Sequence, residues 1–216
     1  AGVVVMNTPG QNANAVAELA IGLMIYMARN QFNPSTGVEI AGKTLGIQGF
    51  GNVGSLVAAK ALALGMKVRA FDPVKSDEDM LVRGVEPTSS VKTLYADCDY
   101  ISLNLPLVTV TERSVGYDLL TAMPKGGVLI NTARKEIVDE SGLERALEER
   151  SDIKYASDVA PDNYTALREK FGLRVYANSK KMGAQTAEAN LNAGLAAARQ
   201  IVDYFETGNV KFQVNK

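Results

Sequence analysis

Histidine is absent from this chain of 216 residues, and cysteine occurs only once, at Cys98. The absence of histidine excludes the side chain that most often transfers protons near neutral pH and most often binds metals, so we expect no metal site. A single cysteine excludes internal disulfides and fits a reducing compartment. We therefore expect a cytoplasmic protein in which Cys98 is a small, buried apolar residue.

Net charge is nearly absent as well, at −1. A balanced charge gives no reason to expect nucleic acid or an anionic membrane surface as a partner. No segment has the roughly 20 consecutive apolar residues that span a bilayer. The most apolar segment, 15–28, contains Glu18 and is predicted to be a buried helix. The chain begins without methionine or a basic leader, so we expect no signal peptide and expect the chain to be part of a longer protein.

Short apolar runs alternate with helical stretches along the chain. This alternation predicts an α/β fold of the Rossmann type, a doubly wound parallel sheet with helices on both faces, over residues 1–206. The expected strands are 2–7, 43–48, 66–71, 85–87, 99–105, 127–132, 153–159 and 174–178. The main expected helices are 12–29, 52–64, the run after an N-cap at Asp139, and 186–205. Ligands of such folds bind at the carboxyl ends of the strands.

The segment GFGNVG follows the strand expected at 43–48 and opens the helix expected at 52–64. Its glycines, Gly49, Gly51 and Gly54, have the spacing of a dinucleotide-binding loop, in which they permit a tight turn, close approach of a pyrophosphate, and packing of helix on strand. The N–H groups near Asn52 and Val53 would bind the phosphates at the positive end of the helix dipole.

Asp72 ends the next strand, at about the offset expected for the carboxylate that binds the adenosine ribose. A carboxylate there repels a 2′-phosphate, so the pattern predicts NAD rather than NADP as cofactor. The alternative interpretation is a glycine-rich turn with an incidental aspartate, and the complete strand–loop–helix–strand context disfavours it.

Polar residues follow several other strands, in the runs SLNLPL, INTARKE, SDVAPDN and NSKKMGAQT. Together with GFGNVG and the early NTPGQNANAVAEL, their order and separation resemble the D-isomer-specific 2-hydroxyacid dehydrogenases over essentially the whole chain. Within that family, the pattern is most similar to the phosphoglycerate dehydrogenase branch. The resemblance implies an NAD-dependent oxidoreductase of D-2-hydroxy acids, with 3-phospho-D-glycerate as the expected substrate.

The resemblance also assigns roles to individual residues. Arg134 would bind the substrate carboxylate and polarise the 2-keto oxygen, a role that suits a planar and permanently charged fork. Asp158 would lie near the nicotinamide carboxamide. The remaining cofactor contacts would come from the loop over the cofactor and from both sides of the nicotinamide. They are Asn104, Leu105, Pro106, Thr111, Thr132, Ala133, Gly183 and Ala184.

Two positions depart from the family pattern. The family has a glutamate where this chain has Asn163, and it has a proline–histidine pair where this chain has Lys180 and Lys181. Both members of the usual acid/base pair are therefore replaced. A free lysine, with a pKa of about 10.4, is a poor base at neutral pH, but burial and neighbouring cations lower that pKa. Because Asn163 is neutral, it does not counteract this effect as a glutamate would.

The sequence leaves three roles open for Lys181: a tuned proton-transfer base, a cation that binds an anionic substrate, or a solvated surface residue. Lys180 is the less important of the pair. A non-catalytic, NAD(H)-sensing binding protein is the alternative function, and an alanine dehydrogenase-type domain fits the motifs less well. The resemblance further implies a homodimer. It also implies that residues 207–216 form a tail running toward a substrate-binding domain largely absent from this chain, which alone would be weakly active or inactive.

Overall fold

The computed structural model describes residues 2–215, in which seven parallel strands form one sheet. The strand order is β3-β2-β1-β4-β5-β6-β7, which is that of a doubly wound Rossmann-type fold. The central strands β4 and β5 are buried along their whole length, because helices cover both faces of the sheet. The strands are β1 (Thr44–Gln48), β2 (Lys67–Phe71), β3 (Glu86–Pro87), β4 (Tyr100–Leu103), β5 (Val128–Asn131), β6 (Lys154–Ser157) and β7 (Val175–Ala177).

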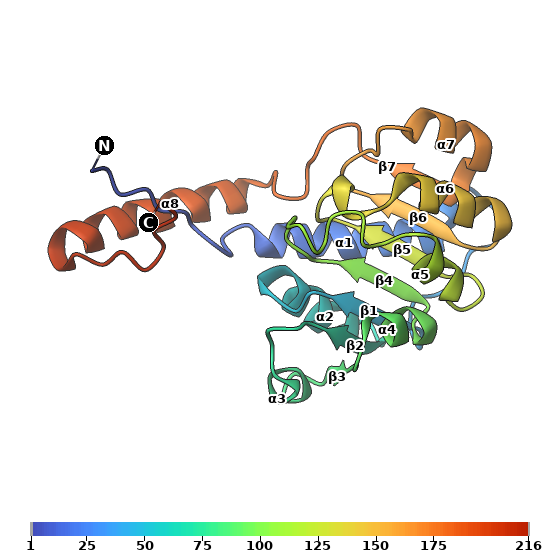
Figure 1. Cartoon of the computed structure of the whole chain (residues 1–216), viewed down its shortest axis with the longest axis horizontal. Helices are drawn as coiled ribbons and strands as arrows, with labels where there is room; N and C mark the ends of the chain where they lie inside the picture. Colours follow the sequence, from blue (N-terminus) through green and yellow to red (C-terminus); the bar gives the residue numbers. More distant parts are fainter. Residues whose placement is uncertain (1, 216) are drawn as a thin grey trace.

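Two layers of helices cover the sheet (Figure 1). One layer packs around the core cluster that contains Met24, Val57 and Met80, and the other around the cluster that contains Leu94, Leu120 and Leu143. The first layer is α1 (Ala13–Ala28), α2 (Asn52–Ala63) and α3 (Asp77–Leu81). The second is α4 (Val91–Asp97), α5 (Tyr117–Ala122), α6 (Glu140–Glu149) and α7 (Tyr164–Phe171). Short 3₁₀ turns are η1 (Asn30–Phe32), η2 (Lys135–Ile137) and η3 (Gly172–Arg174).

Helix α1 covers the part of the sheet that the crossover helices leave open. Helices α2 and α3 lie over the first strands, and α1 packs beside α2 against β5 and β6. Its surface is therefore buried on nearly every side, and the most exposed polar residue in its middle, Glu18, pairs with Lys60 of α2 at 3.6 Å. The apolar side chains that predicted a buried helix at 15–28 are thus buried against α2 and the sheet of this same chain.

Helix ends follow the local sequence signals. Asp139 accepts a hydrogen bond from the Gly142 N–H and caps α6, as predicted. Gly65 follows α2 with φ of +79°, the left-handed conformation that glycine commonly adopts just after a helix. Thr186 caps the last helix, α8 (Ala187–Thr207), which ends at Gly208 in the left-handed conformation.

The prediction of a strand at 2–7 is wrong. Only Met6 forms a bridge, to Gln213 in antiparallel orientation, and Val5 O accepts from the Val214 N–H at 2.9 Å. The segment pairs with neither edge strand, β3 or β7, because its backbone partners come from the C-terminal tail. It lies instead beside α8 and the C-terminal tail, away from the sheet (Figure 1).

Helix α8 projects from the sheet and buries only Ala189. Its exposed apolar side chains are Leu191, Leu195, Ile201, Val202 and Phe205. Such a surface on one helix is typical of a contact with a further domain or chain.

Among the described residues, no helix is both long enough and apolar enough to cross a membrane. Cys98 is fully buried, as expected, and burial raises the pKa of its thiol to about 12.

A charged cluster joins α5, α6 and β6 at the amino end of the sheet. Arg150 donates to the backbone oxygens of Thr121, Met123 and Pro124, and it pairs with Asp152 at 2.7 Å. Asp152 also accepts from the Gly126 N–H at 2.7 Å. The hydrogen bonds from Arg150 hold the pKa of the Asp152 carboxyl well below its usual range.

We expect Asp152→Asn to lower the free energy of unfolding by about 1–3 kcal/mol at pH 7, because charge-assisted hydrogen bonds to Arg150 are lost. The folded-state pKa is depressed, so the contribution is fully present above the unfolded pKa of about 3.9, declines below it, and is lost only as pH falls through the depressed folded-state pKa. Urea unfolding at pH 7 and at about pH 2 measures this difference between variant and wild type. An equal difference at both pH values would contradict the assignment, and Glu112→Gln, an exposed carboxylate, is the control.

Candidate functional site: a nucleotide groove and a cationic cavity

The glycines of the predicted phosphate loop are each required for a different reason. Gly49 has φ of +92°, and a Cβ there would lie 2.6 Å from the Asn104 carbonyl oxygen. A Cβ on Gly54 would lie 2.1 Å from the Gly49 carbonyl oxygen, so α2 can approach β1 only through a glycine. A Cβ on Gly51 would meet nothing within 4 Å, because it would point into open space beside the loop.

Helix α2 begins directly after this loop, at Asn52, with no side chain capping it. Its first N–H groups therefore remain available to an anion, and the helix dipole adds a positive partial charge. A polar cavity of about 180 Å³ lies beside them, lined by Phe50, Gly51, Asn52, Ser55, Lys75, Asp79 and Arg83. The arrangement fits a pyrophosphate.

Asp72 closes the loop from the end of β2. Its Oδ2 accepts from the Phe50 N–H at 2.7 Å, and its Oδ1 accepts from the N–H groups of Val74 and Lys75 at 2.9 and 3.3 Å. The carboxylate thus ties the phosphate loop to the β2–α3 turn, at the position expected for a ribose partner.

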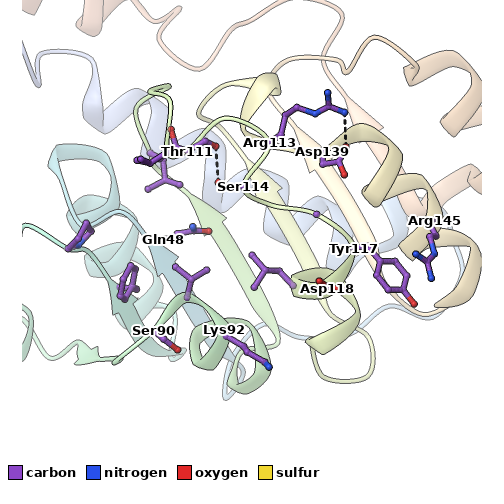
Figure 2. Close-up of a pocket in the computed structure, with 17 residues that line it drawn as sticks. Gln48, Ser90, Lys92, Thr111, Arg113, Ser114, Tyr117, Asp118, Asp139 and Arg145 are labelled. Atoms are coloured by element: carbon purple, nitrogen blue, oxygen red, sulfur yellow. Dashed lines mark hydrogen bonds and ion pairs between the residues drawn. The ribbon is translucent and has the colours of Figure 1, made fainter.

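A groove of about 960 Å³ continues from Asp72 between α4 and α5 (Figure 2). Figure 2 shows Gln48, Ser90 and Lys92 on one side of this groove and Tyr117, Asp118 and Arg145 on the other. Its apolar lining suits a flat heterocycle such as adenine and consists mainly of Phe71, Pro73, Val91, Leu105, Val110 and Leu119.

Thr111 lies in the loop that covers this groove. Its Oγ1 donates to Pro106 O at 2.7 Å and accepts from the Val108 N–H at 2.9 Å, so the hydroxyl holds the loop closed on itself. The predicted residue Thr111 therefore shapes the groove wall, and its hydroxyl is occupied within the loop.

A second cavity, of about 280 Å³, lies at the carboxyl ends of β4 and β5, on the other side of the phosphate loop. It brings together most of the residues predicted for the nicotinamide side, the loop over the cofactor and the substrate: Asn104, Leu105, Pro106, Thr132, Ala133, Arg134, Lys181 and Ala184. Val53, predicted to bind the phosphates, also lines it. Two polar atoms here, Asn104 Oδ1 and Thr132 Oγ1, are buried without a hydrogen-bond partner among the described residues. Such atoms are available to a ligand.

The turn after β5 places Arg134. The Asn131 side chain accepts from the Ala133 N–H at 3.0 Å and donates to Arg134 O at 2.9 Å, which closes the turn around residues 131–134. Arg134 then leaves the sheet with its side chain exposed, and its Nη1 donates to Ala133 O at 2.9 Å.

Lys181 contacts the same backbone oxygen as Arg134, the carbonyl oxygen of Ala133. Its Nζ donates to Ala133 O at 3.3 Å, so two cations converge on one carbonyl oxygen. Much of the Lys181 side chain remains exposed, but its amine end is partly buried at this contact. Desolvation lowers the pKa of Lys181 below its usual value, and the charge of Arg134 lowers it further, against the opposing effects of Asp158 and Glu136.

Asp158 and Gly183 lie behind the wall of this cavity. The Asp158 side chain is fully buried and accepts hydrogen bonds from the loop that carries Lys181. It is not part of the cavity lining. Asn163, predicted to stand at the position of the family glutamate, precedes α7 and has its Oδ1 buried without a partner among the described residues. Its neighbour Asp162 pairs with Lys135.

Two cavity residues, Asn12 and Val16, were not predicted as site residues. They belong to the start of α1, in the run NTPGQNANAVAEL, which the sequence analysis used only as a family motif. Gly10 and the asparagine at the helix start were the available signals: Gly10 has φ of +83°, and a Cβ there would lie 3.0 Å from Asn52 Nδ2. The α1 start therefore packs directly on the phosphate loop.

Comparison with known proteins identifies the family. The model of the D-isomer specific 2-hydroxyacid dehydrogenase NAD-binding domain matches residues 21–177, which is more than half of the chain. The chain belongs to this family.

Relatives of the family domain include hydroxypyruvate reductase of Thermotoga maritima, 36% identical over 93% of this chain and 69% of that protein. The D-3-phosphoglycerate dehydrogenase of Methanocaldococcus jannaschii is 33% identical over 93% of this chain, which covers 41% of that enzyme. Among solved structures, the NAD⁺-bound 3-phosphoglycerate dehydrogenase of Entamoeba histolytica has a TM-score of 0.91 and 47% identity over 99% of this chain and 68% of that one.

The cofactor of this 2-hydroxyacid dehydrogenase domain is NAD, as predicted. The residues of the chain fit it: open space lies at Gly51 beside the α2 N-terminus, Asp72 stands where the sequence predicts the ribose partner, and the orphaned oxygens of Asn104 and Thr132 lie in the cavity beyond. The groove and the cavity lie on either side of the phosphate loop, which is the arrangement that an extended dinucleotide requires.

The two glycines Gly51 and Gly54 should separate binding from folding. We expect Gly51→Ala to leave the melting temperature unchanged and to weaken NADH binding by about tenfold or more, because its methyl group fills space meant for the phosphates. Gly54→Ala, the matched control, should cost about 1–3 kcal/mol of stability, because the methyl group forces α2 away from Gly49. Thermal unfolding and NADH fluorescence titration measure both effects. Equal melting temperatures and equal NADH affinities for the two variants would contradict this division.

Proposed function

We propose that this chain is the cofactor-binding half of an NAD-dependent enzyme that oxidises D-2-hydroxy acids. The observation that carries the proposal is the convergence of Arg134 and Lys181 on Ala133 O, inside the cavity beyond the phosphate loop. An anionic substrate needs a cation to bind it, and the oxidation needs a group that accepts a proton. These two side chains supply one group for each task.

Arg134 binds the substrate in this proposal. Among the described residues, only Nη1 of its guanidinium is hydrogen-bonded, so the rest of the fork can receive a carboxylate. A bidentate contact would fix the orientation of the C2 atom and polarise its oxygen. The rigid turn closed by Asn131 holds the Arg134 backbone for this role.

Lys181 accepts the proton of the 2-hydroxyl in this proposal. NAD, when bound, supplies the chemistry of hydride acceptance from C2. The lowered pKa of Lys181 increases its neutral fraction at neutral pH, which a proton acceptor requires. Asn163 supports this role, because a glutamate at that position would raise the pKa of a nearby lysine. In the reverse direction the Lys181 ammonium returns the proton to the 2-keto oxygen.

The substrate we propose is 3-phospho-D-glycerate, oxidised to 3-phosphohydroxypyruvate as in serine biosynthesis. Support comes from the names of relatives, because the M. jannaschii and E. histolytica proteins are both 3-phosphoglycerate dehydrogenases. The T. maritima relative is a hydroxypyruvate reductase, which favours an unphosphorylated substrate instead.

The relatives are longer than this chain, which covers 69% of the T. maritima protein and 68% of the E. histolytica chain. We propose that the Rossmann domain extends over residues 1–206 and that the tail 207–216 runs toward a substrate-binding domain. The exposed apolar side of α8 supports such a contact. The homodimer, the cytoplasmic location and the weak activity of the chain by itself also remain predictions.

The second candidate is an NAD(H)-sensing binding protein without catalytic activity. The specific observation in its favour is that the chain has no histidine, with Lys181 and Asn163 at the positions where the resemblance predicts the histidine and glutamate of the family's acid/base pair. Retention of Arg134 in the cavity favours the enzyme.

An activity assay distinguishes these two functions. We expect the intact protein to reduce NAD with 3-phospho-D-glycerate, with a kcat of the order of 1–1,000 s⁻¹, as for ordinary enzymes. Production of NADH at 340 nm is the measurement, with D-lactate and D-glycerate as alternative substrates. Tight binding of NADH without turnover of any D-2-hydroxy acid would support the sensor and contradict the enzyme.

Lys181→Gln should lower kcat of the intact enzyme by about 100- to 10,000-fold, the range expected for loss of a general base. In the wild type, kcat/KM for oxidation should rise with pH as Lys181 loses its proton, with a midpoint below the usual lysine value of about 10.4. The variant should lose this dependence. Lys180→Gln is the matched control, with less than about threefold change expected because its charge is at the exposed loop surface. Full turnover by Lys181→Gln would disprove the catalytic assignment.

A further inference from the structure

One buried polar side chain lines the groove that suits adenine (Figure 2). Gln48 is the last residue of β1, and it is only 5% exposed. The other polar side chains among the described residues of this groove are half-buried or exposed. A buried amide requires hydrogen-bond partners, so the partners of Gln48 indicate what this residue does.

The alternation of side chains along β1 places Gln48 on the side of the sheet that faces α4. Leu45 and Ile47 belong to the core cluster that packs against α2. Because side chains alternate along a strand, Gly46 and Gln48 point to the opposite face. That face is densely packed at Gly46, where a Cβ would lie 3.0 Å from Leu94 Cγ of α4. Two residues further along, Gln48 stands where this packing ends and the groove begins.

A buried tyrosine holds the oxygen end of the Gln48 amide. The hydroxyl of Tyr95, in α4, donates to Gln48 Oε1 at 2.9 Å, and the tyrosine is fully buried. Burial raises the pKa of Tyr95 well above its usual value, so the hydroxyl keeps its proton. If the amide were turned over, the hydroxyl hydrogen would be buried without an acceptor, because Gln48 is its only partner among the described residues. Tyr95 therefore fixes the orientation of the amide.

The nitrogen end of the amide is left for a ligand. Within residues 2–215, no atom accepts a hydrogen bond from Gln48 Nε2, which carries two N–H groups. The neighbours of Gln48 in the sheet are Phe71 of β2 and Leu103 of β4, whose side chains have no acceptor. Phe71 also lines the groove, so the N–H groups stand beside an apolar surface that suits a flat base.

Adenine has hydrogen-bond acceptors at its ring nitrogens N1, N3 and N7. A donor of fixed orientation beside an apolar surface is what recognition of such a nitrogen requires. We propose that Gln48 is a specificity-determining residue for the cofactor, whose Nε2 donates to a ring nitrogen of adenine, and that Tyr95 is the positioning residue for this donor. The inference does not rest on the proposed function, because binding of the cofactor is measured without a substrate.

The first test compares Gln48→Met with the wild type in the intact protein. Methionine has nearly the same length as glutamine and lacks the N–H groups. We expect the affinities for NADH and for ADP to fall by the same factor, about threefold to tenfold, as for loss of one hydrogen bond. Fluorescence titration with NADH, and displacement of NADH by ADP, measure the two affinities. An unchanged affinity for ADP would overturn the proposal.

A second test separates a hydrogen bond to the base from packing against it. ADP is compared with its 1-deaza, 3-deaza and 7-deaza forms, each of which has a C–H group in place of one ring nitrogen. The wild type should bind one of the three about threefold to tenfold more weakly than ADP, and Gln48→Met should bind that form and ADP equally. Equal binding of all four compounds by the wild type would overturn the proposal. Persistence of the difference in Gln48→Met would overturn it as well.

Tyr95→Phe tests the positioning role and remains informative if Gln48→Met does not fold. Loss of the hydroxyl frees the amide to turn, so we expect the affinities for NADH and ADP to fall about twofold to fivefold. The same substitution should have no further effect in the Gln48→Met background. Tyr100→Phe is the matched control, with affinities within about twofold of the wild type, because Tyr100 is a buried tyrosine at the amino end of β4 and does not line the groove. Unchanged affinities of Tyr95→Phe would overturn the positioning role.

Discussion

The close approach of α2 to the end of β1 is the contact on which the site depends. With Gly54 against the Gly49 carbonyl, the N-terminus of α2 lies directly after the carboxyl end of β1. Asp72 binds the Phe50 N–H and holds the loop from the neighbouring strand. An apolar groove lies on one side of this contact, and a cationic cavity lies on the other side. A single extended molecule can therefore occupy both.

In the cavity, the balance of charge is set by groups that follow different strands. Arg134 comes after β5, Lys181 after β7 and Asp158 after β6, and the parallel arrangement brings their strand ends to one edge. Partial burial and, after it, the charge of Arg134 lower the pKa of Lys181, whereas Asp158 and Glu136 oppose them. The burial of Asp158 behind the loop keeps its charge near the lysine without exposing it to an anionic substrate. Lys181, predicted from the sequence to stand at the position of the family histidine, thus has one arginine and two carboxylates acting on its amine.

The apolar helices near the two ends of the chain, α1 and α8, differ in how far they are buried. Helix α1 fills the face of the sheet that the crossover helices leave open, and its apolar residues are satisfied within the chain. Helix α8 keeps its apolar side chains on the surface and lies beside the initial segment and the tail. An apolar helical segment in the sequence therefore does not show whether the helix packs in the core of its own domain or lies on a surface that contacts another domain.

The sequence by itself determined the strand–helix alternation, the glycine loop, the carboxylate of Asp72 just after β2 and the N-cap at Asp139. These features depend on local backbone conformation and on short spacings, which the sequence carries directly. Only the tertiary structure decided that Arg134 and Lys181 share the Ala133 carbonyl, that Glu136 faces the lysine, and that Asp158 turns inward to the 178–183 loop. It also decided that residues 2–7 lie against the C-terminal tail and not in the sheet. The reason is that these contacts join residues far apart in the chain, and the choice of partner depends on which sheet edges and helix faces remain open once the core has packed.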